Sequence, residues 1–132
     1  MEINYKELIK LSIQAQKVSY SPYSNFAVGA SLLGKSGKVY TGANIENASY
    51  PAGICAERVA MSKAISEGEK DFEAICITAS SGDHIYPCGV CRQFMSEFSS
   101  DLKVIIAKNE DDFKLHTISE LLPCSFNKDD LI

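Results

Sequence analysis

Three cysteines at the starts of two predicted helices limit most strongly how this chain can fold. Cys88 and Cys91 form a Cys-x-x-Cys pair where a helix over residues 89–98 should begin. Cys55 opens a second helix, expected over residues 55–67. Residues three apart share one face of a helix, so the two sulfur atoms of the pair lie near one point. The positive end of each helix dipole favours the thiolate form, so both helix starts are expected to face one metal ion.

The remaining pattern predicts one mixed sheet between helical layers. The second half of the chain alternates strands with helices, which favours parallel strands there. A length of 132 residues suits one domain, which we expect to span residues 1–132. Besides the two helices above, the expected elements are a helix over 5–18, a hairpin of strands 26–33 and 38–43, strands 74–79 and 104–107, and a short helix that Thr117 and Glu120 cap and Pro123 ends.

The composition argues against several classes of protein. Lys and Arg number 13 against 17 Asp and Glu, and the net charge of −4 argues against a polynucleotide partner, which would need a basic surface. Apolar runs such as residues 104–107 are too short to cross a membrane, and the first residues do not resemble a secretory signal. We therefore expect a cytoplasmic protein, in which five cysteines indicate metal binding or catalysis rather than disulfides.

Three cysteine ligands would make the metal site a catalytic one. Zn²⁺ takes four ligands in a tetrahedron, so three protein ligands leave one position open for water. Glu57 lies two residues beyond Cys55, and in the first turn of a helix both side chains can reach past its end. A carboxylate there can move a proton between the activated water and a substrate without binding the metal. Arg58 and the two helix ends would offset the residual negative charge of three thiolates and Zn²⁺.

Taken singly, none of these residues is specific. Cys55 alone is typical of a small buried hydrophobic residue, Glu57 of a solvated helix position and Arg58 of a surface cation. A lone Cys-x-x-Cys pair also occurs in redox motifs and structural zinc sites. Together, Cys-Ala-Glu at 55–57 and Pro-Cys-Gly-Val-Cys at 87–91 follow the zinc deaminase pattern, with cysteine at a position where histidine also occurs. We assign no metal-binding or catalytic role to the remaining cysteines and histidines: Cys76, Cys124, His84 and His116.

Over nearly its whole length the chain resembles the small, homotetrameric cytidine deaminases. The matching blocks follow the family's order and spacing: 21–24, Phe26, 28–30, 42–50, 55–58, 87–93, 121–123 and Phe126. The resemblance implies an α/β protein with the three-layer α/β/α cytidine deaminase-like fold and one mixed sheet of about five strands. It also implies hydrolytic deamination of free cytidine and 2′-deoxycytidine to uridine and 2′-deoxyuridine, with release of ammonia, as in pyrimidine salvage.

The resemblance implies a role for each matching residue. Cys55, Cys88 and Cys91 would bind one Zn²⁺ per subunit. Glu57 would carry the proton, and Arg58 would hydrogen-bond the ligand sulfurs. The residues implied to bind substrate are Asn44 and Glu46 at the ribose, Phe26 and the Ala56 backbone at the base, and Tyr23, Tyr50 and Phe126, which reach active sites across subunit boundaries in this family. We therefore expect a homotetramer with shared sites and a small nucleoside as its partner, and neither a polynucleotide nor a membrane.

The chain departs from the family pattern at positions that flank the expected site. Tyr86 stands where Ser is frequent before Pro87, and Cys124 and Ser125 stand where Gly and Ala are frequent before Phe126. These departures leave the expected reaction unchanged, although Tyr86 would alter access to the metal.

Two alternatives share the metal-binding cysteines. A deaminase of another substrate, such as the aminoacyl-nucleoside antibiotic blasticidin S, would use the same chemistry. A structural zinc module would bind metal without activity, but such sites usually have four protein ligands, and Glu57 would then have no function.

Overall fold

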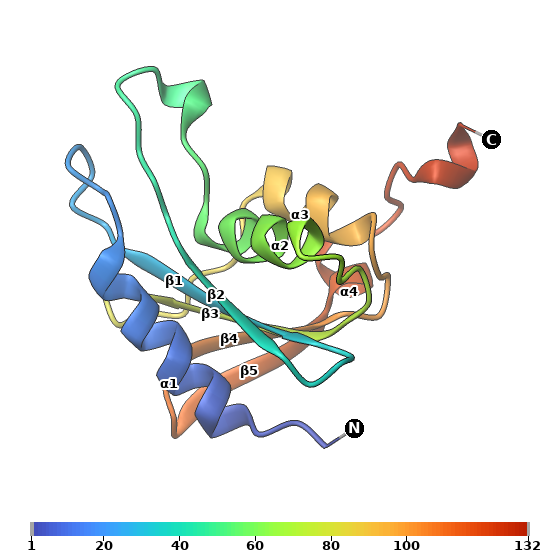
Figure 1. Cartoon of the computed structure of the whole chain (residues 1–132), viewed down its shortest axis with the longest axis horizontal. Helices are drawn as coiled ribbons and strands as arrows, with labels where there is room; N and C mark the ends of the chain where they lie inside the picture. The colour runs from blue at the N-terminus through green and yellow to red at the C-terminus, as the bar shows by residue number, and fades with distance from the viewer. Residues whose placement is uncertain (1, 132) are drawn as a thin grey trace.

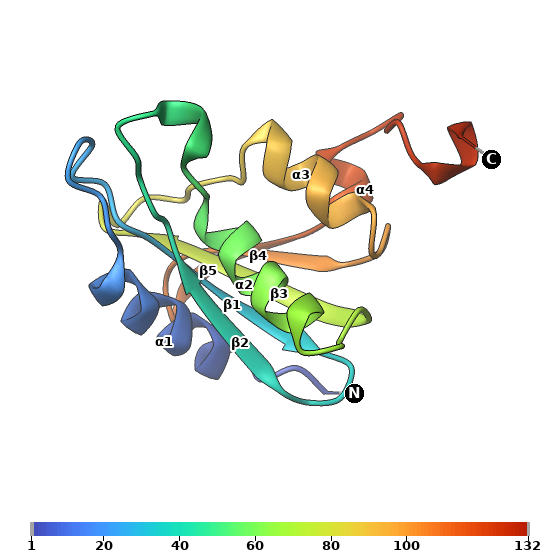
Figure 2. The same cartoon turned by 45° about the horizontal axis from the view of Figure 1, so that its top comes forward.

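A five-stranded mixed sheet organises the chain, in a computed structural model that describes residues 2–131 (Figures 1 and 2). The strands lie in the order β2-β1-β3-β4-β5. β3 and β4 run parallel, as the strand–helix alternation predicts, and the other neighbours run antiparallel. The strands are β1 (Val28–Gly34), β2 (Val39–Ala43), β3 (Phe72–Ala79), β4 (Lys103–Asn109) and β5 (Asp112–Thr117).

Helices cover both faces of this sheet, which confirms the expected three layers. The α-helices are α1 (Tyr5–Ala15), α2 (Ala56–Ser66), α3 (Gly89–Ser96) and the short α4 (Ile118–Leu121). Single 3-10 turns cover Gln16–Val18, Tyr50–Ala52 and Lys128–Asp130. α1 lies on one face, and α2 and α3 lie on the other (Figures 1 and 2). Within residues 2–131, no helix is both long and apolar enough to span a bilayer.

The central strand β3 is apolar throughout because both of its faces are buried. Ile75 and Ile77 pack into the core under α2 and α3. Ala74 and Cys76 point the other way, into the smaller core under α1. Successive strand residues alternate between the two faces, so a strand between two helical layers needs apolar residues at every position.

Two glycines let the helices approach the sheet closely. A Cβ atom on Gly29 of β1 would collide with the carbonyl oxygen of Ser12 in α1. A Cβ atom on Gly42 of β2 would lie 2.5 Å from the carbonyl oxygen of Ala56 and 2.6 Å from the nitrogen of Ala60, both in α2. The start of α2, which carries Cys55 and Glu57, therefore rests directly on the sheet.

The structure differs from the sequence-based prediction in the bounds of several elements and in one additional strand. The strand expected from residue 26 begins at Val28, so Phe26 precedes the sheet. The α-helix expected over 5–18 ends at Ala15, and a 3-10 turn continues it to Val18. β5 is absent from the expected strands: Phe113 and Leu115 alternate with polar residues, but this pattern covers only a few positions, and no residue of this edge strand is buried.

Candidate active site

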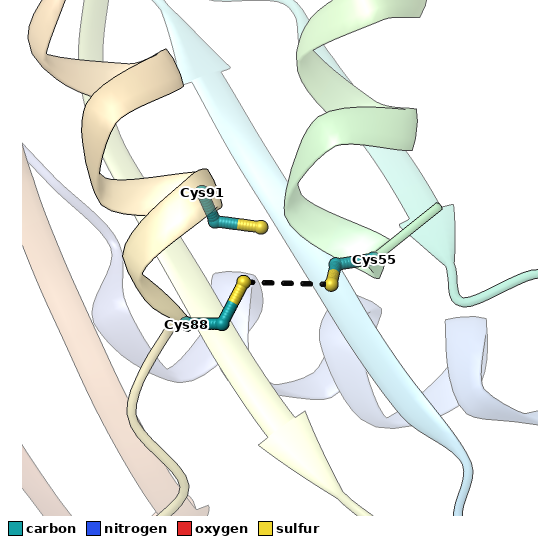
Figure 3. Close-up of side chains that lie close together, drawn as sticks. All are labelled: Cys55, Cys88 and Cys91. Carbon is teal, nitrogen blue, oxygen red and sulfur yellow. Dashed lines mark hydrogen bonds between the residues drawn. The ribbon is translucent and has the colours of Figure 1, made fainter. Parts of the chain in front are cut away.

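The sulfur atoms of Cys55, Cys88 and Cys91 point toward one another from the starts of α2 and α3 (Figure 3). All three lie within 4.8 Å of one another, and those of Cys55 and Cys88 are 3.8 Å apart. A tetrahedral zinc site with Zn–S bonds of about 2.3 Å has S···S separations of about 3.8 Å. The distance between the first two sulfurs matches this geometry, so the predicted ligands form one cluster that fits zinc.

Hydrogen bonds among the three thiols and Arg58 give this cluster anionic character. The pKa of Cys55 is lowered to about 5, chiefly by a hydrogen bond from Cys91 and further by Arg58 and Cys88. The same bond, together with burial, raises the pKa of Cys91. Proton sharing of this kind suits a site that binds a cation through thiolates, because thiolate is the form that binds metal.

Arg58 supplies the positive charge beside these sulfurs. Its Nη2 donates a hydrogen bond to the sulfur of Cys55 at 3.8 Å. Its Nε is buried and has no hydrogen-bond partner within residues 2–131. The guanidinium therefore has donor capacity left for the further thiolates that metal binding would create, and this fits a cationic metal held by three cysteines.

Glu57 lies at the second position of α2, immediately behind the cluster. Its side chain is only 3% exposed. Burial raises the pKa of this carboxyl to about 7, and the negative charge of Cys55 adds to the effect. A carboxyl group with a pKa near neutral can both take and give a proton at working pH, which is the property of a general acid–base catalyst.

A pocket of about 510 Å³ lies beside the cluster, with Cys55 and Arg58 in its wall. Four of the predicted substrate-binding residues line it as well: Tyr23, Asn44, Glu46 and Tyr50. The remaining lining comes from the surrounding loops: Ser24, Ile45, Asn47, Gly53 and Ile54. The volume is that of a small-molecule site, and the wall combines apolar side chains with a few polar groups.

Asn44 and Glu46 are both fixed by hydrogen bonds from the 19–28 segment. The Asn44 side chain donates to the carbonyl oxygen of Phe26 and accepts from the backbone N–H of Val28, both at 2.9 Å. The carboxylate of Glu46 accepts from the backbone N–H groups and the hydroxyl of the Tyr23–Ser24 turn. The Ser24 hydroxyl is the main reason that the pKa of Glu46 is lowered. Sequence reasoning missed this role of Ser24, although it lies within a block that carries the resemblance.

Three other predicted contact residues do not line this pocket: Phe26, Ala56 and Phe126. Phe26 is half-buried just before β1, and Ala56 is buried in the first turn of α2. Phe126 is 59% exposed on the C-terminal segment, which extends away from the sheet and helices (Figures 1 and 2). Tyr23 and Tyr50 meet edge to face with ring centroids 6.4 Å apart, and both are largely exposed.

The residues without an expected role lie outside the cluster. Cys76 is buried in β3, where burial raises the pKa of its thiol to about 12. Cys124 is exposed, with a φ of 54°. Tyr86 does not line the pocket; its ring packs against His116 of β5.

Comparisons with known proteins agree with this geometry. Residues 2–108 match the cytidine and deoxycytidylate deaminase zinc-binding region. The cytidine deaminase of Halalkalibacterium halodurans is 50% identical over 125 residues, covering 94% of this chain and 95% of that protein. The probable cytidine deaminase of Dictyostelium discoideum is 43% identical over 134 residues, covering 98% of this chain and 90% of that protein.

Solved structures give the same result. The crystal structure of cytidine deaminase from Burkholderia pseudomallei superposes with a TM-score of 0.88 at 39% identity, covering 94% of this chain and all of that one. The enzyme from Mycobacterium tuberculosis superposes with a TM-score of 0.85 at 33% identity, covering 95% and 98%. The expected fold and the expected zinc cofactor are thereby confirmed. This chain belongs to the cytidine and deoxycytidylate deaminase family, and its cysteine cluster fits one zinc ion per subunit.

Proposed function

We propose that this protein hydrolyses free cytidine and 2′-deoxycytidine to the corresponding uridines and ammonia. The observation that carries the proposal is the convergence of three cysteine sulfurs beside a buried glutamate at one wall of a nucleoside-sized pocket. The relatives named cytidine deaminase support the choice of substrate.

In this mechanism Cys55, Cys88 and Cys91 hold the metal and Glu57 moves the protons. Bound zinc supplies Lewis acidity, which lowers the pKa of a water molecule toward neutrality. Glu57 accepts a proton from the attacking water and delivers it to the ring nitrogen N3, which makes C4 electrophilic. The water oxygen bonds to C4. Glu57 then carries the remaining proton of that hydroxyl group to the amine, and the C4–N4 bond breaks as the C4 carbonyl forms. One water is consumed and one ammonia leaves.

The pocket wall supports a neutral nucleoside as substrate. In this proposal Asn44 and Glu46 of the wall bind the ribose. Phe26 and the Ala56 backbone, which do not line the pocket, contact the base as the family resemblance implies. Glu46 is held with its carboxylate charged, because its hydrogen bonds lower its pKa. A carboxylate accepts hydrogen bonds from sugar hydroxyls and repels a phosphate group, which favours a free nucleoside over a nucleotide.

We further propose a cytoplasmic homotetramer with active sites shared between subunits. Tyr50 is 79% exposed on the 44–54 loop, and this loop and the C-terminal segment that carries Phe126 both project beyond the sheet (Figures 1 and 2). Exposed aromatic side chains on projecting segments are suited to contact a neighbouring copy. Free thiols on all five cysteines are consistent with a reducing compartment.

An ultraviolet assay with cytidine, 2′-deoxycytidine and blasticidin S, with and without a chelator, tests the function. We expect both cytosine nucleosides to be deaminated, chelation to abolish turnover, and added zinc to restore it. Zinc-loaded protein that deaminates only blasticidin S would identify the rival substrate, and zinc-loaded protein without any activity would favour a structural module. Light scattering during size-exclusion chromatography tests the tetramer separately.

A further inference from the structure

The segment between β3 and α3 delivers Cys88 to the cluster, and side chains rather than main-chain hydrogen bonds hold residues 83–87 in place. Cys88 itself is bonded to α3, because its carbonyl oxygen accepts from the N–H of Arg92 at 3.0 Å. Residues 83–87 form no regular secondary structure, and within residues 2–131 they make no hydrogen bond between main-chain atoms. Cys88 is exposed, and its side chain does not cap α3. A segment with so few internal bonds opens easily unless other contacts fix it.

Arg92, in the first turns of α3, ties the residue before Cys88 to the end of α4. Its Nε donates to the carbonyl oxygen of Pro87 at 2.8 Å, and its Nη1 donates to the carbonyl oxygen of Leu121 at 2.8 Å. Hydrogen bonds from a guanidinium are stronger than those between neutral groups. One half-buried side chain therefore fixes Pro87 against the C-terminal part of the chain.

Tyr86 attaches the 83–87 segment to β5. Its hydroxyl lies 3.1 Å from Nε2 of His116, and the two rings pack with centroids 5.3 Å apart. Nδ1 of His116 lies 3.6 Å from the carboxylate of Glu120 in α4, and this contact orients the imidazole. Two residues before Tyr86, His84 meets Asp112 at the start of β5 at 3.1 Å.

We propose that Arg92, Tyr86 and His116 are positioning residues for Cys88, and that they determine how long the protein retains its zinc. The inference rests on the proposed function only in requiring that the three cysteines bind zinc. The contacts of Arg92 and of Tyr86 both attach the 83–87 segment to the region where β5 meets α4. Loss of one of these contacts lets Cys88 leave the cluster more often. A site left with two cysteines then releases the metal faster.

The test is the rate at which excess chelator removes zinc from the full-length protein, well below its unfolding temperature. Tyr86→Phe removes only a neutral hydrogen bond, so we expect zinc release about fivefold faster than in the wild type. Arg92→Gln removes a charge-assisted bridge, so we expect release at least about tenfold faster. The matched control is Tyr40→Phe, because the Tyr40 hydroxyl bonds Glu69 at 3.0 Å, beyond the far end of α2. This control should release zinc at the wild-type rate.

A second measurement separates positioning from a general loss of structure. Saturating zinc should return the kcat of Tyr86→Phe to the wild-type value, with an unchanged unfolding temperature. If Arg92→Gln does not fold, Tyr86→Phe decides alone. The proposal is overturned if the Tyr86→Phe and Arg92→Gln variants release zinc at the wild-type rate. It is also overturned if Tyr40→Phe accelerates zinc release equally, or if the wild-type protein holds no zinc. Zinc-loaded protein that leaves cytidine intact defeats only the proposed function, because the chelator assay contains no substrate.

Discussion

The starts of α2 and α3 both deliver cysteine sulfur to one point, but the fold anchors them in different ways. Cys55 follows Ile54, whose main chain exchanges two hydrogen bonds with Ile45, each at 2.9 Å. Gly42 lets the first turn of α2 pack directly onto β2. Cys88 instead follows a segment that side chains hold. Main-chain hydrogen bonds and close packing on the sheet anchor the start of α2, whereas side chains hold the segment before α3, although Cys91 of α3 is itself buried in the core.

The two helices also carry different residues after their first cysteine. At the second helical position, Glu57 of α2 is 3% exposed and Val90 of α3 is 61% exposed. At the third position α2 has Arg58, and α3 has the ligand Cys91. The rigidly anchored helix thus carries the proposed proton carrier and the cation, while the other carries two of the three cysteines. Precise placement matters most for the group that must reach both the water and the substrate.

The largest expected effect comes from changing the second residue of each helix, which is Glu57 in α2 and Val90 in α3. Glu57→Gln keeps the size of the side chain but cannot carry a proton, so kcat should fall by about 10²- to 10⁴-fold. Zinc content should stay at one per subunit, because Glu57 is not a ligand. Val90→Thr, at the matching position of α3, should leave kcat near the wild-type value. Steady-state kinetics with metal analysis measures both, and retention of most activity by Glu57→Gln would defeat its assignment.

This contrast shows why the chemistry could be predicted from the sequence. Cys55, Glu57 and Arg58 lie within four successive positions, and Cys88 and Cys91 within one helical turn, so local geometry brings the side chains of each group together. The zinc deaminase pattern, which contains both groups, predicted that the two groups meet. The parallel pair β3 and β4 was predictable from the alternation of strands with helices in the second half of the chain.

The contacts between distant segments could not be predicted from local pattern. Ser24 bonds Glu46 across 22 residues, and Tyr86 bonds His116 across 30. No rule of sequence spacing predicts either pair, because each contact forms only when distant segments pack together in the fold. β5 was not predicted, for a related reason. Hydrogen bonds to β4 define this edge strand, and none of its side chains is buried.

The second prediction concerns the cost of burying Glu57 without metal. Its folded-state pKa of about 7 lies above the ordinary value of 4.5, so this group contributes stability at pH 4.5 that is lost as pH rises through 7. The loss approaches about 3 kcal/mol above pH 8. Glutamine has no charge to bury. Metal-free Glu57→Gln should therefore exceed the metal-free wild type in unfolding free energy by up to that amount at pH 8, and match it near pH 4.5. Urea unfolding under reducing conditions at the two pH values checks this, and a difference independent of pH would contradict it.

Two glycines next to the helix starts give a third comparison: Gly42 of β2, which packs against the first turn of α2, and Gly89 in the first turn of α3. Gly42→Ala pushes a Cβ atom against backbone atoms of α2, so the free energy of unfolding should fall by about 1–3 kcal/mol. Gly89→Ala, in the first turn of α3, meets nothing within 4 Å. It should be neutral or should stabilise by up to about 1 kcal/mol, because alanine restricts the unfolded chain. Denaturant unfolding of both variants measures the difference, and similar effects would show that the two helix starts are equally tightly packed.

The smallest expected effect concerns Arg58, the cation of α2 that contacts the cysteine cluster. Arg58→Gln removes a charged donor from the sulfur of Cys55, while the hydrogen bond from Cys91, the larger cause of the low pKa, remains. The pKa of Cys55 in metal-free protein should therefore rise from about 5 by roughly one unit. Thiolate absorbance followed against pH measures the shift. Lys63→Gln, which removes a positive charge near the other end of α2, is the matched control and should leave the titration unchanged. An unshifted Cys55 in Arg58→Gln would mean that the helix dipole and the neighbouring thiols alone stabilise the thiolate.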